Sequence, residues 1–218
     1  MSASALREPQ AARIALMPDG FARMVPVSRE TLDRLTAYVG LLERWNQRIN
    51  LVGRNTMGDV WRRHILDSAQ LYALVPPRTR VLVDLGSGAG LPGMILAIMG
   101  VAEVHLVESD QRKAAFLREA SRLTNTTVTI HADRIEKIAP FKADIVTARA
   151  LASLDELIDI SEKFVSDRTL CLFLKGAAIE TELTVASARW SFAVERYRSL
   201  ADPAGCVVKL EHLQRVAA

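Results

Sequence analysis

A run of glycines directly after an apolar segment carries the strongest chemical signal in this sequence. Residues 80–93 read Arg-Val-Leu-Val-Asp-Leu-Gly-Ser-Gly-Ala-Gly-Leu-Pro-Gly. Glycine has no Cβ, so at Gly86 and Gly88 the backbone can turn tightly and approach a ligand closely. A helix that begins just after the turn would direct free N–H groups into it. The third glycine of the dinucleotide fingerprint is replaced by Leu91, so the spacing favours S-adenosylmethionine over a dinucleotide.

Two further polar groups follow the next predicted strands. Glu108 closes the predicted strand segment Val-His-Leu-Val at 104–107 and stands 24 residues after Asp84, a spacing that lets a carboxylate accept hydrogen bonds from both ribose hydroxyls. Ile135 and Glu136 follow a third strand, where a backbone N–H and a polar side chain could read an adenine edge. Each residue alone also fits a helix cap or a surface position. Because ligands of open parallel sheets lie beyond the carboxyl ends of the strands, the three groups together predict one cofactor site.

Arginine is concentrated in the first part of the chain. Residues 1–79 contain eleven arginines and seven acids, whereas the remainder has 17 basic and 18 acidic residues. The range 44–63 holds one acid, Asp59, and five arginines: Arg44, Arg48, Arg54, Arg62 and Arg63. Such a local excess suggests contact with phosphates, as in RNA. From charge alone, a solvated helix face explains it equally well.

The length and composition indicate a globular protein with a sizeable hydrophobic core. Its 218 residues are 50% hydrophobic, enough for one large domain or one domain with an extension. We find neither an apolar run of membrane-spanning length nor a secretory signal. The two cysteines, Cys171 and Cys206, form no framework of disulfides or metal ligands. We therefore expect no metal site and a reducing, cytoplasmic location.

Helical periodicity dominates the region before the glycine run. Apolar residues recur at three- and four-residue steps over 28–50, with Ser28 as a plausible N-cap. A second helix is predicted over 59–75 and ends at Pro76-Pro77. These segments predict a helical cap over 23–79, preceded by a flexible tail over 1–22.

From residue 80 onward, strands alternate with helices, which is typical of an α/β fold with a doubly wound parallel sheet. The last two strands are separated only by 200–205 and read as a hairpin, so one edge strand should run antiparallel. We therefore predict one α/β domain over 80–218. Its strands are predicted at 80–85, 103–108, 127–131, 143–148, 169–174, 191–197 and 206–212, and its helices at 91–99, 111–124, 153–165 and 177–189.

Several longer strings make the chain similar to a known family. It resembles the small-subunit (16S) ribosomal RNA guanine-N7 methyltransferase G family, formerly called glucose-inhibited division protein B. The strings lie within roughly 41–176: Trp45-Asn46, Asn50-Leu51, His64-Ile-Leu-Asp-Ser68, Asp84 to Gly93, Arg134-Ile-Glu136, Arg149-Ala-Leu-Ala-Ser-Leu154 and Leu174-Lys-Gly176. The chain departs from the family pattern at 204–206, where Ala-Gly-Cys replaces an Arg-His pair.

The resemblance implies a class I S-adenosylmethionine-dependent methyltransferase: a Rossmann-like, mostly parallel seven-stranded sheet with an N-terminal helical cap. It implies small-subunit 16S rRNA as partner, and we expect a monomer. It also implies a cofactor pocket lined by Gly86, Leu91, Ile135, Glu136 and Arg149, to which the spacing adds Gly88 and Glu108. The predicted RNA contacts are Arg44, Arg48, Arg62, Arg63, His64 and Lys175.

The residues also bear on the methyl acceptor. Guanine N7 carries a lone pair and no proton, so its methylation needs no general base, and we assign no catalytic residue. Cys171 lies within an apolar strand and is expected to be buried, which disfavours the nucleophilic cysteine route to cytosine C5. No Asn/Asp-Pro-Pro-aromatic loop for adenine methylation is present.

Several residues keep two interpretations. Arg149 could touch the cofactor or the target base, and His64 could be structural or an RNA contact. For Asp67, Asn46 and Asn50 a structural role is favoured. Two other functions remain open: a small-molecule methyltransferase on the same fold, and a non-catalytic module that binds cofactor or RNA.

Overall fold

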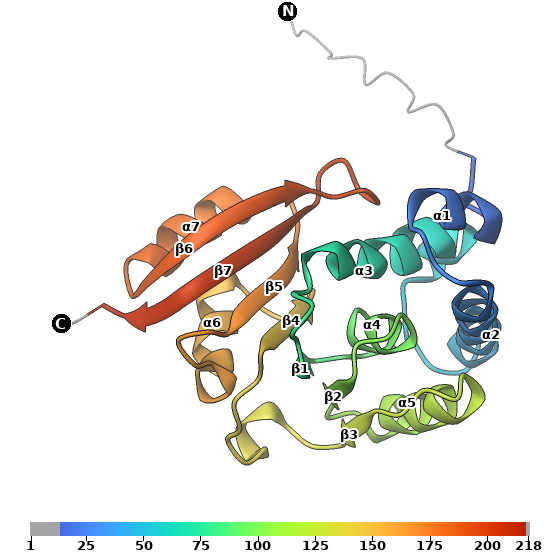
Figure 1. The fold of residues 1–218 in the computed structure, drawn as a ribbon, viewed down its shortest axis with the longest axis horizontal. Helices are drawn as coiled ribbons and strands as arrows, with labels where there is room; N and C mark the ends of the chain where they lie inside the picture. The colour runs from blue at the N-terminus through green and yellow to red at the C-terminus, as the bar shows by residue number, and fades with distance from the viewer. Residues whose placement is uncertain (1–13, 217–218) are drawn as a thin grey trace, which may run out of the picture.

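A seven-stranded mixed sheet forms the centre of the molecule in the computed structural model, which describes residues 14–216 (Figure 1). The strand order is β3-β2-β1-β4-β5-β7-β6, and β1 to β5 are mutually parallel. The strands are β1 Val81–Leu85, β2 Glu103–Val107, β3 Thr129–His131, β4 Ile145–Arg149, β5 Leu170–Lys175, β6 Trp190–Arg198 and β7 Cys206–Arg215.

The predicted antiparallel strand is present, but one place in from the edge. β7 pairs antiparallel with both β5 and β6, so β6 forms the edge and β7 lies inside it. As the hairpin partner, β6 pairs with the outer edge of β7 along nearly the whole length of both strands. The order of alternating strands and helices therefore confirms the predicted fold class and corrects the position of this one strand.

The two faces of the sheet are buried under different helices, because successive side chains of a strand point to opposite sides. Leu82 packs into the cluster beneath the cap, whereas Val83 packs against the layer of α6 and α7. Figure 1 shows α4 and α5 on one side of the sheet and α6 and α7 on the other. These helices span α4 Gly93–Ile98, α5 Gln111–Leu123, α6 Leu154–Ser161 and α7 Ile179–Ser187.

The N-terminal helices share their core with the sheet domain. Helix α2, Arg29–Asn46, packs Tyr38 and Trp45 against Phe116 of α5, with ring centroids 6.0 and 5.8 Å apart. Residues of both regions belong to one buried hydrophobic cluster. The cap is thus a layer on the sheet domain and has no separate core.

The tail predicted over 1–22 is wrong in its last part. Helix α1, Pro18–Met24, contains Phe21, which is fully buried and has its ring centroid 5.5 Å from that of Trp61. This buried contact anchors the short helix on the cap. Residues 1–13 lie outside the described part of the chain.

The first predicted helix is four residues shorter than expected. Helix α2 ends at Asn46 because the side-chain Oδ1 of this residue accepts hydrogen bonds from the N–H groups of Leu51 (2.9 Å) and Val52 (3.0 Å). These bonds turn the chain back after the helix. Asn46 is 7% exposed, which supports the structural role favoured for it.

The second predicted helix is an irregular helical segment. It comprises a 3₁₀ helix η1 (Arg54–Asp59), a π-helical turn η2 (Trp61–Leu66), the short α3 (Asp67–Ala69) and a 3₁₀ helix η3 (Gln70–Leu74). It starts five residues before the predicted boundary at 59. The apolar periodicity predicted a helix here but did not distinguish its type. π-Helical turns are rare and are frequent at functional sites.

None of the helices within residues 14–216 is long and apolar enough to cross a membrane.

The remaining short helices are η4, Ile135–Lys137, after β3, and η5, Glu162–Phe164, after α6. Helix α4 begins two residues later than predicted, after the extended glycine turn.

Candidate functional site

The glycine turn adopts backbone angles that explain its composition. Gly86, Gly88 and Gly90 have φ values of +64°, +58° and +84°, a region that L side chains rarely adopt. The Ser87 N–H donates to the carbonyl of Val107 on β2 at 2.9 Å, which ties the turn to the neighbouring strand. The turn is therefore a fixed backbone surface at the carboxyl end of β1.

A tyrosine of the cap holds the turn from outside. The Tyr38 hydroxyl donates to the Ala89 carbonyl at 2.6 Å, and the whole side chain is buried. Burial raises the pKa of Tyr38, so this hydroxyl keeps its proton as a donor. Sequence analysis missed this residue, because within the helical pattern it is only one more apolar position.

Asp84 closes the turn from below. It is fully buried, accepts from the Thr147 hydroxyl at 2.7 Å and accepts from the Gly93 N–H at 3.2 Å. Burial raises its pKa to about 6, although the hydrogen bonds and the charge of Arg149 act in the opposite direction. Asp84 therefore joins β1, β4 and the start of α4, and offers no free oxygen to solvent.

The structure brings Glu108 to the glycine turn, as its spacing predicts. One carboxylate oxygen accepts from the Gly88 N–H and the other from the Asp110 N–H, both at 2.8 Å. Glu108 is 7% exposed. Each carboxylate oxygen has a second lone pair, so the group can still accept ligand hydroxyls.

The other predicted cofactor residues are placed differently. Leu91 is 3% exposed and belongs to the core beneath the turn. Ile135 is half-buried on η4, and its carbonyl accepts from the Lys163 ammonium, while Glu136 on the same short helix is exposed. Residues of η4 follow β3, so they lie at the same carboxyl edge of the sheet as the turn.

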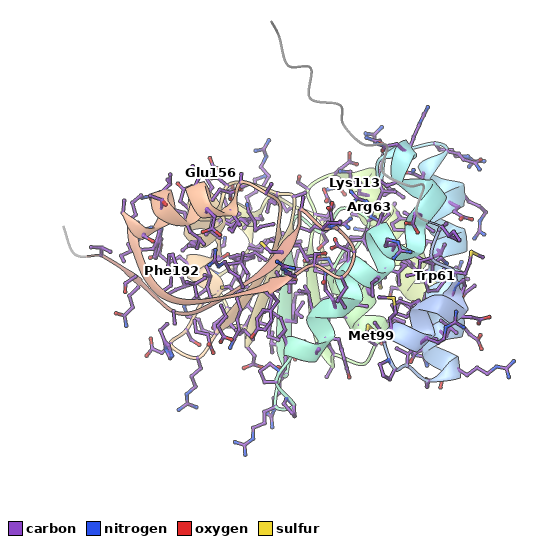
Figure 2. All side chains as sticks on the ribbon, turned by 90° about the horizontal axis from the view of Figure 1, so that it is seen from above. Trp61, Arg63, Met99, Lys113, Glu156 and Phe192 are labelled. Atoms are coloured by element: carbon purple, nitrogen blue, oxygen red, sulfur yellow. The ribbon has the colours of Figure 1, made fainter. Side chains whose placement is uncertain are left out.

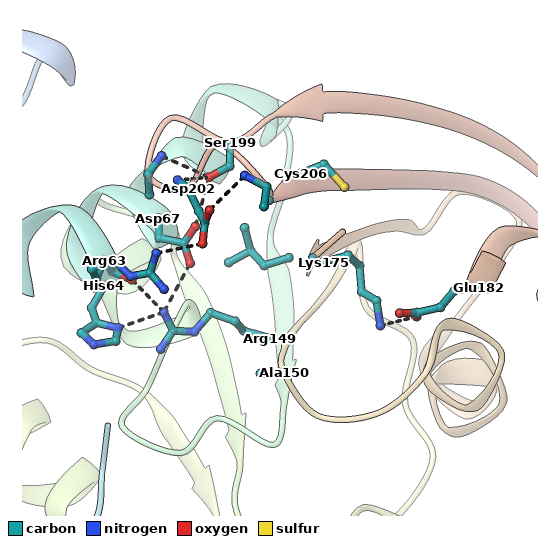
Figure 3. A pocket seen from close by; sticks show the side chains of 15 residues that line it. Arg63, His64, Asp67, Arg149, Ala150, Lys175, Glu182, Ser199, Asp202 and Cys206 are labelled. Carbon is teal, nitrogen blue, oxygen red and sulfur yellow. Dashed lines mark hydrogen bonds and ion pairs between the residues drawn. The ribbon is translucent and has the colours of Figure 1, made fainter. Parts of the chain in front are cut away.

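A cavity of about 390 Å³ lies beyond the ends of β4 and β5, between the cap and the β6–β7 hairpin (Figure 3). Four of the predicted residues line it, namely Arg63, His64, Arg149 and Lys175. The hairpin contributes the segment 204–206, where the chain departs from the family pattern. The fold thus unites residues from three distant parts of the chain in one pocket.

Arg149, the last residue of β4, is anchored to the helical segment of the cap. Its Nη1 donates to Asp67 Oδ2 (3.3 Å), His64 Nδ1 (3.1 Å) and the Arg63 carbonyl (3.3 Å), as Figure 3 shows. Burial raises the pKa of Asp67, and the Arg149 guanidinium opposes this. Asp67 and His64 therefore act as anchors of Arg149, which favours the structural interpretation of both.

His64 is 6% exposed and bonded on both ring nitrogens. Its Nε2 lies 2.6 Å from Thr56 Oγ1, and the Thr56 hydroxyl lies 2.6 Å from the Gly53 carbonyl. Burial, then the charges of Arg149 and Arg63, lower the pKa of His64 to about 3. The imidazole is neutral at physiological pH, so it brings no positive charge to RNA.

Lys175 is not an exposed phosphate ligand in this conformation. Its side chain is 9% exposed, and Nζ lies 2.5 Å from Glu182 Oε2 and donates to the Ala152 carbonyl at 2.9 Å. Glu182 also accepts from the Leu154 N–H at 2.8 Å. The pair fastens the loop after β4 to α7.

The arginine cluster divides into two groups. Arg62 pairs with Asp59 at 2.9 Å and Arg63 with Asp202 at 2.8 Å, so both contribute to internal contacts. Arg44 and Arg48, at the end of α2 and just after it, are exposed, as is Arg54. Figure 2 shows Arg63 among the side chains between the cap and the hairpin.

Cys171 is fully buried on β5, and burial raises the pKa of its thiol to about 12. A thiol of this kind is not a nucleophile at neutral pH. The expectation that Cys171 is a core residue is confirmed.

Comparison with solved structures supports the fold. The chain aligns with a ribosomal protein L11 methylase from Lactobacillus delbrueckii subsp. bulgaricus with a TM-score of 0.56 and 14% identity, over 69% of this chain and 77% of that one. A TehB-like SAM-dependent methyltransferase from Corynebacterium glutamicum gives a TM-score of 0.55 and 14% identity, over 82% and 99%. At this identity the likeness establishes the class I methyltransferase fold alone.

Sequence relatives establish the family. The family model described as GidB, rRNA small subunit methyltransferase G, matches residues 31–203. The protein called ribosomal RNA small subunit methyltransferase G is 52% identical in Rhodospirillum rubrum, over 92% of this chain and all of that one. Its counterpart in Rhodospirillum centenum is 55% identical over 86% and 87%. The chain therefore belongs to the rRNA small subunit methyltransferase G family, as the sequence strings indicated.

Proposed function

We propose that this chain, an S-adenosylmethionine-dependent rRNA methyltransferase of the small-subunit family, transfers a methyl group to N7 of a guanine in 16S rRNA. The observation that carries this proposal is the pocket beside the glycine turn. Ala150 lines the pocket, and the next residue, Leu151, lies over the turn, with its Cδ1 only 2.6 Å from where a Cβ on Gly86 would stand. One loop thus separates a cofactor cradle from a space for the acceptor base.

The turn residues fit the cofactor. Gly86 and Gly88 offer backbone without a Cβ, Glu108 offers carboxylate lone pairs for ribose hydroxyls, and Arg149 offers a positive charge for the methionine carboxylate. The residues Leu91, Ile135 and Glu136 complete the proposed set. When bound, S-adenosylmethionine supplies an electrophilic methyl group on sulfur.

Positioning suffices for the reaction on the acceptor side. Guanine N7 has a free lone pair, so a general base, which contributes roughly 10²–10⁴-fold elsewhere, is not required. Holding N7 in line with the methyl group can supply roughly 7–11 kcal/mol of the barrier. This agrees with a site in which two carboxylates are already hydrogen-bonded within the protein: Asp84 to Thr147, and Asp67 to Arg149.

We assign RNA binding to four arginines of the cap. Arg44 and Arg48 are exposed and can meet phosphates, and Arg62 and Arg63 can do so at the expense of their ion pairs. His64 and Lys175 line or support the pocket instead. We propose a monomer, and a 16S rRNA substrate favours a cytoplasmic location.

The test is incubation of the protein with methyl-labelled cofactor and small subunits from cells that lack this methylation. We expect label in 16S rRNA, with the modified nucleoside identified as 7-methylguanosine by mass spectrometry. A double variant, Arg44→Ala with Arg48→Ala, should weaken RNA binding and reduce its salt dependence without changing cofactor affinity. Label that enters a small metabolite, or another position of a base, would refute the proposal.

A further inference from the structure

The hydrogen bonds of Arg149 leave one edge of its guanidinium to a ligand. Within residues 14–216, the bonds described for this side chain all start from Nη1 and end on the cap, at Asp67, His64 and Arg63. The edge formed by Nε and Nη2 is the one that binds a carboxylate with two parallel hydrogen bonds. The cap therefore fixes the orientation of a group that is itself exposed to the pocket.

The protonation of His64 follows from its partners. A guanidinium donates and never accepts, so the bond from Arg149 requires that His64 Nδ1 accepts. The ring proton must then be on Nε2, which donates to Thr56 Oγ1, and the Thr56 hydroxyl donates to the Gly53 carbonyl. With this tautomer each ring nitrogen of His64 has a partner of the opposite kind, whereas the reversed tautomer would place two protons between His64 Nδ1 and Arg149 Nη1.

The burial of His64 favours the neutral form of its imidazole. His64 is 6% exposed, and both its surroundings and the neighbouring guanidinium groups disfavour the imidazolium form. Strands β1 and β4 pair with Leu85 opposite Ala148, so Arg149, the next residue of β4, lies beside the start of the glycine turn. The guanidinium that His64 holds is thus close to the cradle assigned to the cofactor.

We propose that His64 is a positioning residue: Thr56 holds it as the neutral Nε2–H tautomer, and it orients Arg149 to receive the carboxylate of the cofactor's methionine part. The inference rests on the proposed cofactor role of Arg149 and deepens it. A phosphate would suit the same edge of the guanidinium, but the proximity to the turn favours the carboxylate.

The first test compares two variants of His64, with side chains of different reach, by calorimetry. In His64→Asn the new side chain can place an amide oxygen where Nδ1 lies, whereas in His64→Gln the longer side chain extends to the Nε2 position. For S-adenosylhomocysteine we expect a dissociation constant about tenfold higher in His64→Gln and within about twofold of wild type in His64→Asn. For 5′-methylthioadenosine, which lacks the carboxylate, we expect no change in either variant.

Equal losses for both ligands in His64→Gln would show a merely structural role and overturn the inference. No loss for either ligand would do the same. The variant Arg149→Lys distinguishes a failure of the His64 inference from a failure of the proposed cofactor role of Arg149. If Arg149→Lys leaves S-adenosylhomocysteine affinity unchanged, the cofactor role of Arg149 is wrong; if it weakens binding while His64→Gln does not, only the role of His64 is wrong.

A second measurement uses the spectroscopic signature of the tautomer. Nitrogen-15 spectra of the imidazoles should show His64 protonated on Nε2 only, between pH 5.5 and 8, and protonation on Nδ1 would overturn the inference. Thr56→Val should weaken S-adenosylhomocysteine binding, whereas Thr56→Ser should restore it. Thr169→Val is the matched control: its buried hydroxyl donates to the Ala143 carbonyl at 2.7 Å, distant from the pocket, so stability should fall without a change in affinity.

Discussion

Gly93, at the start of α4, lies closer to the sheet than any side chain would allow. A Cβ built on it would stand 2.5 Å from Leu106 Cδ2 and 2.6 Å from Asp84 Cβ. Both neighbours are fully buried on adjacent parallel strands, β2 and β1, so neither can move aside cheaply. Gly93→Ala therefore tests whether this glycine sets the distance between α4 and the sheet.

The expected cost follows from three contributions. Forcing a methyl group into a close-packed core costs about 1–3 kcal/mol. Moving the helix also weakens the bond from the Gly93 N–H to Asp84, now 3.2 Å long, and hydrogen bonds to charged groups contribute about 1.5–3 kcal/mol. The higher helix propensity of alanine returns about 1 kcal/mol. We expect a net loss of about 3 kcal/mol in the free energy of unfolding.

Thermal unfolding measures this directly. For a chain of 218 residues, a loss of about 3 kcal/mol lowers Tm by about 6–12 °C. Gly40→Ala is the matched control, since Gly40 lies inside α2 and its added Cβ would meet only the Arg44 side chain, at 3.7 Å. It should leave Tm unchanged or raise it. A Tm decrease below about 2 °C for Gly93→Ala would refute the packing argument.

Two other predictions concern the glycine turn. Gly86→Val places a β-branched residue at φ +64° against the Leu151 side chain, so the dissociation constant for S-adenosylhomocysteine should rise at least 100-fold by calorimetry; unchanged affinity would contradict the placement of the cofactor. The pKa of Asp84 is raised from 3.8 to about 6, so the folded state binds the proton more tightly and loses about 2 kcal/mol of stability as pH rises from 4 to 7. Asp84→Asn cannot titrate, so its Tm relative to wild type should rise over this range, and a constant Tm difference would show that Asp84 is not responsible.

Much of the fold could be predicted because its signals are local. The glycine spacing at 86–90 determines a turn with positive φ, and alternating apolar runs determine the order of strands and helices. Glu108 was predictable too, because the end of one parallel strand lies beside the end of the next. The exact ends of helices were not, since the end of α2 depends on Asn46 bonding to residues beyond the helix.

The roles of the polar residues could not be predicted from their neighbours in sequence. Lys175 looked like a phosphate ligand after a strand, but α7 places Glu182 against it. Arg63 looked like a free cation, but the β6–β7 hairpin brings Asp202 to it. Whether a charge is free or paired depends on elements that fold next to it from far along the chain.

The sequence by itself determined the glycine turn, the type of fold and the family, because these reside in short-range spacing and in strings of adjacent residues. Only the tertiary structure decided what His64 and Arg149 do. These residues are 85 positions apart, and the bond between them exists because the cap packs over the end of β4. Burial at that junction, which no local pattern records, keeps the imidazole neutral and makes it an acceptor for the guanidinium.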